Sequence, residues 1–158
     1  LKDGSADIAV VTTPTVHTAS LIETVVRPIT EVAVCSPYFK ELADKQISLS
    51  ELINFPLISL GKDTKSFEFY SALFTAHGLP YKPDIEAFTA DQILPMVEAD
   101  LGIGFVPEEF LREGDSICRI KLEEKIPKRS IVIIKRKGQP LSVAAKELER
   151  MIRECGNQ

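Results

Sequence analysis

The amino-acid sequence predicts a mixed α/β fold, and three observations lead to this class. Short apolar runs alternate along the chain with segments whose apolar residues recur at helical spacing, a pattern typical of a sheet covered by helices. The 158 residues are enough for one domain or two small lobes with buried cores. A composition of 44% hydrophobic and 27% charged residues is that of an ordinary globular protein.

The predicted strands are short runs rich in apolar and β-branched residues, most of them bounded by turn-forming residues. In chain order they are ADIAVV (6–11), ITEVAVC (29–35), PLISL (56–60), DIEAF (84–88), IGFV (103–106), SICRIKL (116–122) and RSIVIIKR (129–136). A polar connection is expected between the first two of them.

The predicted helices have apolar residues on one face and recognisable ends. A short helix follows the second strand, with Ser50 as its N-cap and Pro56 as its stop. The next helix begins at about Thr64 and ends at Gly78. Its apolar face carries Phe67, Tyr70, Leu73, Phe74 and His77.

Two further helices are expected in the second half of the chain. Thr89, followed three residues later by Gln92, forms a capping-box signature for a helix that reaches Ala99. Pro95 lies beyond the first turn of that helix, so a kink or a later true start is expected. Ser142 is the N-cap of the last helix. Its apolar positions are Ala145, Leu148, Met151, Ile152 and Cys155.

Gly102 and Gly104 raise the question of a nucleotide-binding loop. Such a loop needs G-x-G-x-x-G after a strand and before a helix. Here a helix precedes the glycines, a strand follows them, and Pro107 stands in the third position. The glycines are therefore expected to permit close backbone approach at a helix-to-strand joint. The stretch GKDTKS (61–66) lacks the P-loop spacing, and its free backbone N–H groups could hold an anion.

Charge, cysteine usage and histidine spacing exclude several classes of function. The net charge of −4 gives no overall attraction to nucleic acid. A basic cluster is expected to be a solvated strand edge, with a nucleic-acid role as the alternative: Lys128, Arg129, Lys135, Arg136 and Lys137. The odd number of cysteines, three, argues against a disulfide framework and favours a reducing cytoplasm. No apolar run approaches the roughly 18 residues of a membrane span.

Metal and catalytic sites find little support. His17 and His77 do not have the spacing of metal ligands, and no metal or cofactor is expected. Cys35 is expected to be a small buried hydrophobe, with a nucleophilic role as the alternative. No catalytic residue is proposed.

Three stretches resemble the effector-binding domain of LysR-type transcriptional regulators. LKDGSADIAVVTTP (1–14) is similar to a strand of that family that ends in small hydroxylated residues. DQILPMVEADLGIGFVPEEFL (91–111) resembles its helix, glycine-x-glycine strand and proline, although Asp100 stands where glycine is commoner. RSIVIIKRKGQPLSVAAKELERMI (129–152) resembles its closing strand and final helix. The similarity covers nearly all of the chain.

The resemblance implies a two-lobed α/β fold like that of type 2 periplasmic binding proteins. Lobe I would comprise residues 1–30 and 130–158, and lobe II would comprise residues 31–129. The first strand and helix of lobe I would be missing from this chain, and a DNA-reading helix-turn-helix would lie upstream. The implied function is effector sensing and not catalysis.

The effector is expected to contact strand ends and helix starts in the cleft between the lobes, where hydroxyl groups and backbone N–H groups favour a small anion. The candidate residues are Thr12, Thr13, Ser59, Leu60, Gly61, Lys62, Phe88, Thr89 and Ala90. The residues alone favour a simpler interpretation, in which Thr89 only caps its helix and Thr12 only ends a strand, whereas the resemblance favours binding.

Two other classes of function remain alternatives. A solute-binding protein of the same fold could serve transport, although it would normally carry a secretory signal peptide. An enzyme would need an acid, a base or a nucleophile in the cleft. For the regulator, the expected partners are the effector, DNA through the upstream segment, and further copies in a homodimer or homotetramer, without a membrane.

Overall fold

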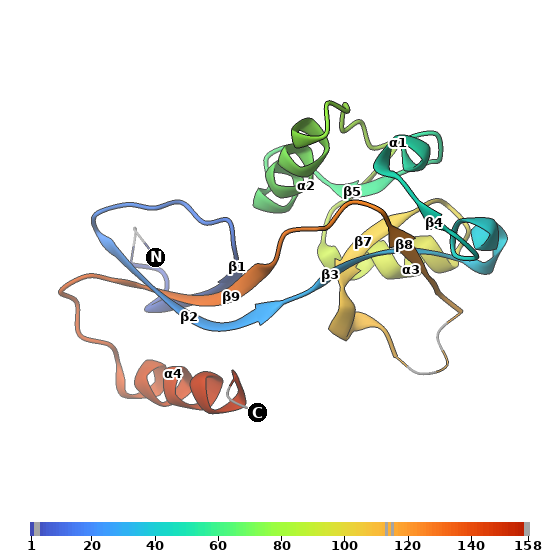
Figure 1. Ribbon diagram of the computed structural model, residues 1–158. Coiled ribbons are helices and arrows are strands. Elements are labelled where there is room, and N and C mark those ends of the chain that lie inside the picture. Colours follow the sequence, from blue (N-terminus) through green and yellow to red (C-terminus); the bar gives the residue numbers. More distant parts are fainter. Residues whose placement is uncertain (2–3, 113, 115, 157–158) are drawn as a thin grey trace. The chain divides into compact units, whose positions relative to one another are not determined.

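The computed structural model describes residues 1, 4–112, 114 and 116–156, and the chain divides into two compact units (Figure 1). Unit 1 comprises Leu1–Ile29 and Lys128–Gln158, and unit 2 comprises Thr30–Pro127. Among the described residues, no helix combines the length and the apolar character that a membrane crossing needs.

Unit 1 contains a three-stranded antiparallel sheet and one helix, α4. Strand β9 (Arg129–Arg136) lies between β1 (Ile8–Thr12) and β2 (Leu21–Ile29), and it pairs with both. Helix α4 (Val143–Gly156) follows β9 and packs against β2. The Ser142 hydroxyl accepts a hydrogen bond from the N–H of Ala145 at 3.2 Å, which confirms the predicted cap.

The polar connection predicted between the first two strands was wrong in its second half, because residues 21–28 belong to the nine-residue strand β2. Pro28 lies near the end of this strand and pairs with Ser130. Proline has no N–H to donate, so it is confined to edge strands. Strand β2 is indeed at an edge of the described sheet, with only β9 beside it.

Helix α4 is attached to the sheet by charged groups as well as by apolar ones. Glu149, which is only 9% exposed, accepts hydrogen bonds from Lys135 Nζ of β9 at 3.0 and 3.1 Å and from Arg153 at 2.7 Å. Ala145 is buried as predicted, whereas Leu148 and Met151 are about half exposed. Only part of the predicted apolar face of α4 is therefore buried against the sheet.

Unit 2 has two small sheets joined by a bridge. The strands of the larger sheet, in the order β4-β8-β3-β7, are β4 (Gln46–Ile47), β8 (Cys118–Leu122), β3 (Glu31–Cys35) and β7 (Gly104–Pro107). Strand β3 is antiparallel to both neighbours. The smaller sheet pairs β5 (Ile58–Leu60) with β6 (Ile85–Ala87) in parallel. A parallel bridge between Leu57 and Ile103 connects the two.

Helices cover both faces of the β3–β7 pair. The helices of unit 2 are α1 (Leu49–Leu52), α2 (Lys65–Ala76) and α3 (Ile93–Glu98), with short 3-10 turns η1 (Pro37–Leu42), η2 (Ala90–Gln92) and η3 (Glu108–Phe110). Ala33 and Phe105 pack with residues of α1 and α2, whereas Val34 and Val106 pack with α3. Since successive strand residues face opposite sides, unit 2 has a helix–sheet–helix arrangement.

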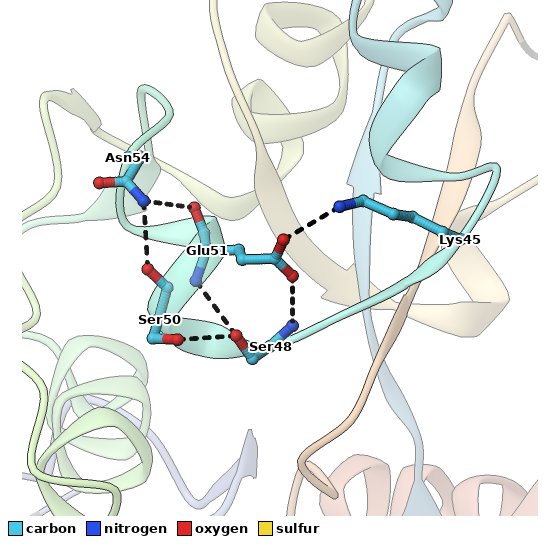
Figure 2. Close-up of polar contacts among 5 residues, drawn as sticks. All are labelled: Lys45, Ser48, Ser50, Glu51 and Asn54. Atoms are coloured by element: carbon cyan, nitrogen blue, oxygen red, sulfur yellow. Dashed lines mark hydrogen bonds and ion pairs between the residues drawn. The ribbon is translucent and has the colours of Figure 1, made fainter.

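The N-cap of α1 is Ser48 and not the predicted Ser50. Figure 2 shows that the Ser48 hydroxyl accepts from the N–H of Glu51 at 3.3 Å, and Glu51 accepts from the N–H of Ser48 at 3.2 Å. This reciprocal pair is a capping box. The Ser50 hydroxyl contacts the Ser48 hydroxyl at 2.7 Å and accepts no backbone N–H of α1 among the described residues. The S-x-x-E spacing that favours Ser48 is present in the sequence.

Helix α3 starts late, as the position of Pro95 predicted. The capping box of Thr89 and Gln92 belongs to the 3-10 turn η2, and the α-helix itself begins at Ile93. Pro95 then lies in the first turn of α3, where a backbone N–H would have no acceptor within the helix, so the proline costs no helical hydrogen bond.

Gly102 and Gly104 allow close approach, as predicted from their place between a helix and a strand. A Cβ atom on Gly102 would lie 2.5 Å from the carbonyl oxygen of Pro56, and one on Gly104 would lie 2.6 Å from Ile93 Cγ2. Gly104 is in β7, whereas Gly102 precedes the strand. Asp100 adopts the left-handed conformation with φ 61°, and its carboxylate accepts from the Ser36 hydroxyl at 2.5 Å.

Candidate functional site

In unit 1, Thr12 and Thr13 end β1 beside the start of β9. Arg129 donates from Nη2 to the Thr12 hydroxyl oxygen at 2.7 Å and from Nε to the Thr13 carbonyl oxygen at 2.6 Å. The N–H of Ser130 donates to the Thr13 hydroxyl oxygen at 2.9 Å. Both hydroxyl oxygens therefore act as acceptors.

This arrangement leaves the hydroxyl protons of Thr12 and Thr13 available. A threonine hydroxyl has one proton to donate and two lone pairs. Within the described part of the chain, neither hydroxyl donates to another residue. Both side chains are half-buried, so their protons can be offered to an acceptor from outside the protein. The pair is suited to an anion's oxygen atoms.

Arg129 is the residue of this site that sequence reasoning missed. It had been assigned to a solvated basic cluster, and this was wrong, because the side chain is only 4% exposed. Lys135 of the same cluster is partly buried against Glu149. The available signal was the position of Arg129 at the first residue of a buried strand, where a charged side chain needs partners.

In unit 2, the other predicted residues gather at one edge of the β5–β6 sheet. The two strands are parallel, with Leu60 opposite Ala87. Their carboxyl ends therefore meet at the same edge, which brings the loop at Gly61 and Lys62 next to the turn at Phe88 and Thr89. The parallel pairing thus brings these residues together at one edge.

The residues at this edge differ in their exposure. Ser59 is buried, and its hydroxyl donates to the Leu60 carbonyl oxygen at 3.1 Å. Phe88 is 91% exposed, and Lys62, Thr89 and Ala90 are exposed as well. Burial raises the pKa of Tyr81 to about 12. The buried Tyr81 hydroxyl is therefore neutral at pH 7.

The turn at Thr89 has both used and unused backbone donors. Gln92 Oε1 accepts from the N–H groups of Phe88 at 2.9 Å and Thr89 at 3.2 Å. The N–H groups of Ala90 and Asp91 make no hydrogen bond to any residue that the structure describes. Donors at the start of a helix attract negative charge.

Carboxylates near this edge, those of Glu86 and Asp91, oppose an anion. The carboxylate of Glu86 lies beside Gly61, where a Cβ atom would be 2.9 Å from Glu86 Oε1. Lys62 contributes the opposite charge from the same loop, which leads into α2 with Thr64 as its N-cap.

Unit 2 also has an open cavity of about 430 Å³ beside α3. Its lining residues are Asp91, Leu94, Pro95, Glu98, Glu109, Phe110 and Arg112. None of the predicted site residues lines it. Three carboxylates against one guanidinium make it unfavourable for an anion.

Metal-ligating groups do not gather elsewhere in the part of the chain that the structure describes. Over residues 1, 4–112, 114 and 116–156, the structure brings no three His, Cys, Asp or Glu side chains into metal-binding proximity. His77 is the C-cap of α2. Cys35 is fully buried, in agreement with its predicted packing role.

The sequence matches the LysR substrate binding domain family model over residues 1–156. The chain is 32% identical over 149 residues to the uncharacterized HTH-type transcriptional regulator YwbI of Bacillus subtilis (strain 168), which covers 91% of this chain and 48% of that protein. The chain thus spans about half the length of this curated relative.

Solved structures show the same fold at low identity. The regulatory domain of Synechocystis PCC6803 CcmR in complex with 2-PG has a TM-score of 0.82 and 17% identity, covering 98% of this chain and 76% of that one. The effector-binding domain of QuiR in complex with shikimate has a TM-score of 0.80 and 17% identity, covering 99% and 75%. The α/β fold is that of these effector-binding domains. With a family model matched over nearly its whole length, this chain belongs to the LysR substrate-binding domains, which bind effectors and are not enzymes.

Proposed function

We propose that this chain senses a small anion on behalf of a bacterial LysR-type transcriptional regulator. Family membership gives the effector-binding role. The chemical class of the effector is inferred from hydrogen-bond donors in both units. The likeness to YwbI, whose description is that of an HTH-type transcriptional regulator, favours regulation over transport.

The observation that carries the anion proposal is the hydrogen bonding of Thr12 and Thr13. Their oxygen atoms are occupied by Arg129 and by the N–H of Ser130, so each hydroxyl is set to donate. The Thr12 hydroxyl oxygen accepts from a guanidinium, which strengthens this hydroxyl as a donor. An anion gains more from such a donor than a neutral ligand does.

In unit 2, the proposal assigns the contacts to the edge of the β5–β6 sheet. The N–H groups of Ala90 and Asp91, the Thr89 hydroxyl and Lys62 are its donors. Gly61 and Phe88 shape the edge, and Ser59 and Leu60 support it from within the strand. If both units contact one effector, the effector binds more tightly to the arrangement of the units in which both contacts form. This difference in affinity shifts the population toward that arrangement and thereby carries the signal.

The relatives support a small anionic ligand. QuiR was solved with shikimate, an organic anion, and CcmR with 2-PG. At 17% identity these structures share the fold with this chain, and their ligands serve only as models for a panel of probes.

The remaining parts of the proposal concern the whole regulator. We assign residues 1–30 and 130–158 to lobe I and residues 31–129 to lobe II. An upstream strand and helix would complete lobe I beside the exposed edge of β1, and an upstream helix-turn-helix would bind DNA. The regulator would act in the cytoplasm as a homodimer or homotetramer.

The experiment is a thermal-shift panel of matched probes. Each anion is paired with a neutral analogue of the same shape: shikimate with its methyl ester, and benzoate with benzamide, with inorganic phosphate added. At least one anion is expected to raise the melting temperature by a few degrees while its neutral partner does not. Equal shifts from neutral partners, or no shift from any anion, would contradict the anion proposal.

A further inference from the structure

Cys35 and Cys118 occupy directly opposite positions on neighbouring strands. Cys35 ends β3, Cys118 begins β8, and the antiparallel register pairs the two residues. Opposite residues of an antiparallel pair have Cα atoms about 4.5–5.5 Å apart and side chains on the same face. A disulfide spans Cα separations of about 4.4–6.8 Å. The backbone therefore already has the spacing of a cross-strand disulfide.

The surroundings of the two thiols differ in a way that suits sequential oxidation. Both side chains belong to the same apolar cluster, in which Cys35 is fully buried and Cys118 is partly exposed. The Cys35 thiol donates to the Phe39 carbonyl oxygen at 3.6 Å. Burial raises the pKa of Cys35 to about 12, with smaller contributions from Cys118 and Glu41. Cys118 is thus the accessible thiol, and Cys35 is a protonated partner behind it.

We propose that Cys35 and Cys118 form a redox modification site that takes up two oxidising equivalents from a hydroperoxide as a reversible disulfide. The Cys118 thiolate attacks one peroxide oxygen, which forms an S–O bond and breaks the O–O bond. The alkoxide or hydroxide that leaves takes up the proton that the Cys118 thiol had lost and becomes an alcohol or water. The Cys35 sulfur then attacks the sulfur of the Cys118 sulfenic acid. An S–S bond forms, the S–O bond breaks, and the hydroxide leaves as water with the proton of Cys35.

The place of the pair in the chain gives the modification a structural consequence. Strand β3 is the first strand after the chain leaves unit 1 at Ile29, and β8 is the last strand before the chain returns at Lys128. A disulfide would cross-link these two strands at the centre of the larger sheet. It would restrict the sliding or separation of the two segments that carry the chain between the units. This site does not depend on the proposed effector.

The test uses hydrogen peroxide on the folded chain, with Cys155 as an internal reference. Cys155 is exposed on α4 and has no thiol opposite it in the described sheets. After peroxide treatment in native buffer, free thiols are blocked in denaturant and the peptides are mapped by mass spectrometry without reduction. The expected product is an intramolecular Cys35–Cys118 cross-link that has lost two hydrogen atoms, and dithiothreitol should restore both thiols.

Two variants separate this result from other oxidation products. Cys155→Ser removes the reference thiol and should leave the cross-link unchanged. Cys118→Ser, combined with Cys155→Ser, should leave Cys35 as a free thiol after the same treatment, because Cys35 is buried. The proposal is overturned if Cys118 stops at a sulfenic or sulfinic acid while Cys35 stays free. It is also overturned if Cys118 forms cross-links between chains, or if both thiols persist under conditions that fully oxidise Cys155.

Discussion

A single buried arginine sets the hydrogen-bonding state of the β1 end. Arg129 uses two donors of its planar fork, one for the Thr12 hydroxyl and one for the Thr13 carbonyl. Lysine has one ammonium group without this fork geometry. The hydrogen bond from Arg129 therefore determines how the Thr12 hydroxyl is oriented.

The first prediction concerns Arg129→Lys. Because the lysine cannot make both contacts, the Thr12 proton is no longer directed outward, and affinity for the anion that performs best in the panel should fall about tenfold, or about 1.4 kcal/mol. Titration calorimetry measures the loss, and circular dichroism checks that the fold is retained. Arg136→Lys, at the other end of β9, serves as the control and should leave affinity unchanged. Equal affinities for Arg129→Lys and the parent chain would rule out this role.

Some residues of the site could be predicted from sequence and one could not. Thr12 and Thr13 follow a recognisable strand, so their place at its end was predictable. Arg129 was not, because a local pattern of basic residues does not reveal that the Thr12–Thr13 backbone lies beside the start of β9. That contact joins residues far apart in the chain and depends on the antiparallel register.

At the scale of one element, α1 shows how contacts at its first turn stabilise a short helix. It has only four residues, so its end contacts carry a large share of its stability. Lys45 and the N–H of Ser48 both bind Glu51, and both contacts lower the pKa of that carboxyl.

The second prediction distinguishes the two candidate caps of α1. Ser48→Ala removes the hydroxyl that accepts from Glu51, and it should lower the free energy of unfolding by about 1 kcal/mol. Ser50→Ala leaves the capping box intact and should cost no more than a few tenths of a kcal/mol. Urea unfolding of both variants gives the comparison. A larger cost for Ser50→Ala would show that Ser50 is the cap.

The third prediction concerns the glycine before β7. In Gly102→Ala the new methyl group would meet the backbone of Pro56, which also accepts a hydrogen bond from the N–H of Ile103 at 2.8 Å. Because backbone cannot move aside as a side chain can, the cost in unfolding free energy should be about 1–3 kcal/mol. Gly61→Ala is the control, since its methyl would meet only the flexible end of Glu86. Thermal unfolding should show the larger loss for Gly102→Ala, and similar losses would refute the close-approach explanation.

The strands and long helices were predictable because their patterns are local. Strand β9 has the predicted bounds, and α2 begins and ends where its cap residues indicated. Strand β2 was missed because Pro28 and scattered polar residues hide it, and its pairing with β9 can be recognised only in three dimensions. The N-cap of α1 was predicted at Ser50, although the S-x-x-E spacing from Ser48 to Glu51 indicates Ser48. The correct cap was therefore predictable from the sequence.

At the scale of the whole molecule, the two units are stabilised in different ways. Unit 2 buries apolar side chains on both faces of its larger sheet. In unit 1, α4 leaves Leu148 and Met151 half exposed, and its contact with β9 includes the buried Glu149. The stability of unit 1 therefore depends more on ion pairs than the stability of unit 2 does.

The fourth prediction is a pH dependence of unit 1. Hydrogen bonds from Arg153 and Lys135 hold the pKa of Glu149 below its usual value of 4.5. A carboxyl whose pKa is lower in the folded state stabilises the fold above the unfolded pKa, and this stabilisation is lost as the pH falls through the folded value. Glu149→Gln should therefore lower the melting temperature at pH 7 and have little effect in acid.

The control for this pH dependence is Glu147→Gln. Glu147 pairs with Arg150 on the exposed side of the same helix, where water screens the interaction. Its effect at pH 7 should be clearly smaller than that of Glu149→Gln. A pH profile of Glu149→Gln that runs parallel to that of the parent chain would exclude the ion pair as an anchor of α4.

The central claim is that threonine hydroxyls and backbone donors bind an anionic effector, and titration calorimetry of Thr12→Val and Thr89→Val tests it most directly. The titrant is the panel anion with the largest thermal shift, and Thr18→Val, in the same unit as Thr12 but outside the site, is the control. Valine keeps the shape and removes the hydroxyl, so each site variant should bind about tenfold more weakly or worse, while Thr18→Val binds like the parent chain. Unchanged affinity in both Thr12→Val and Thr89→Val would contradict the account.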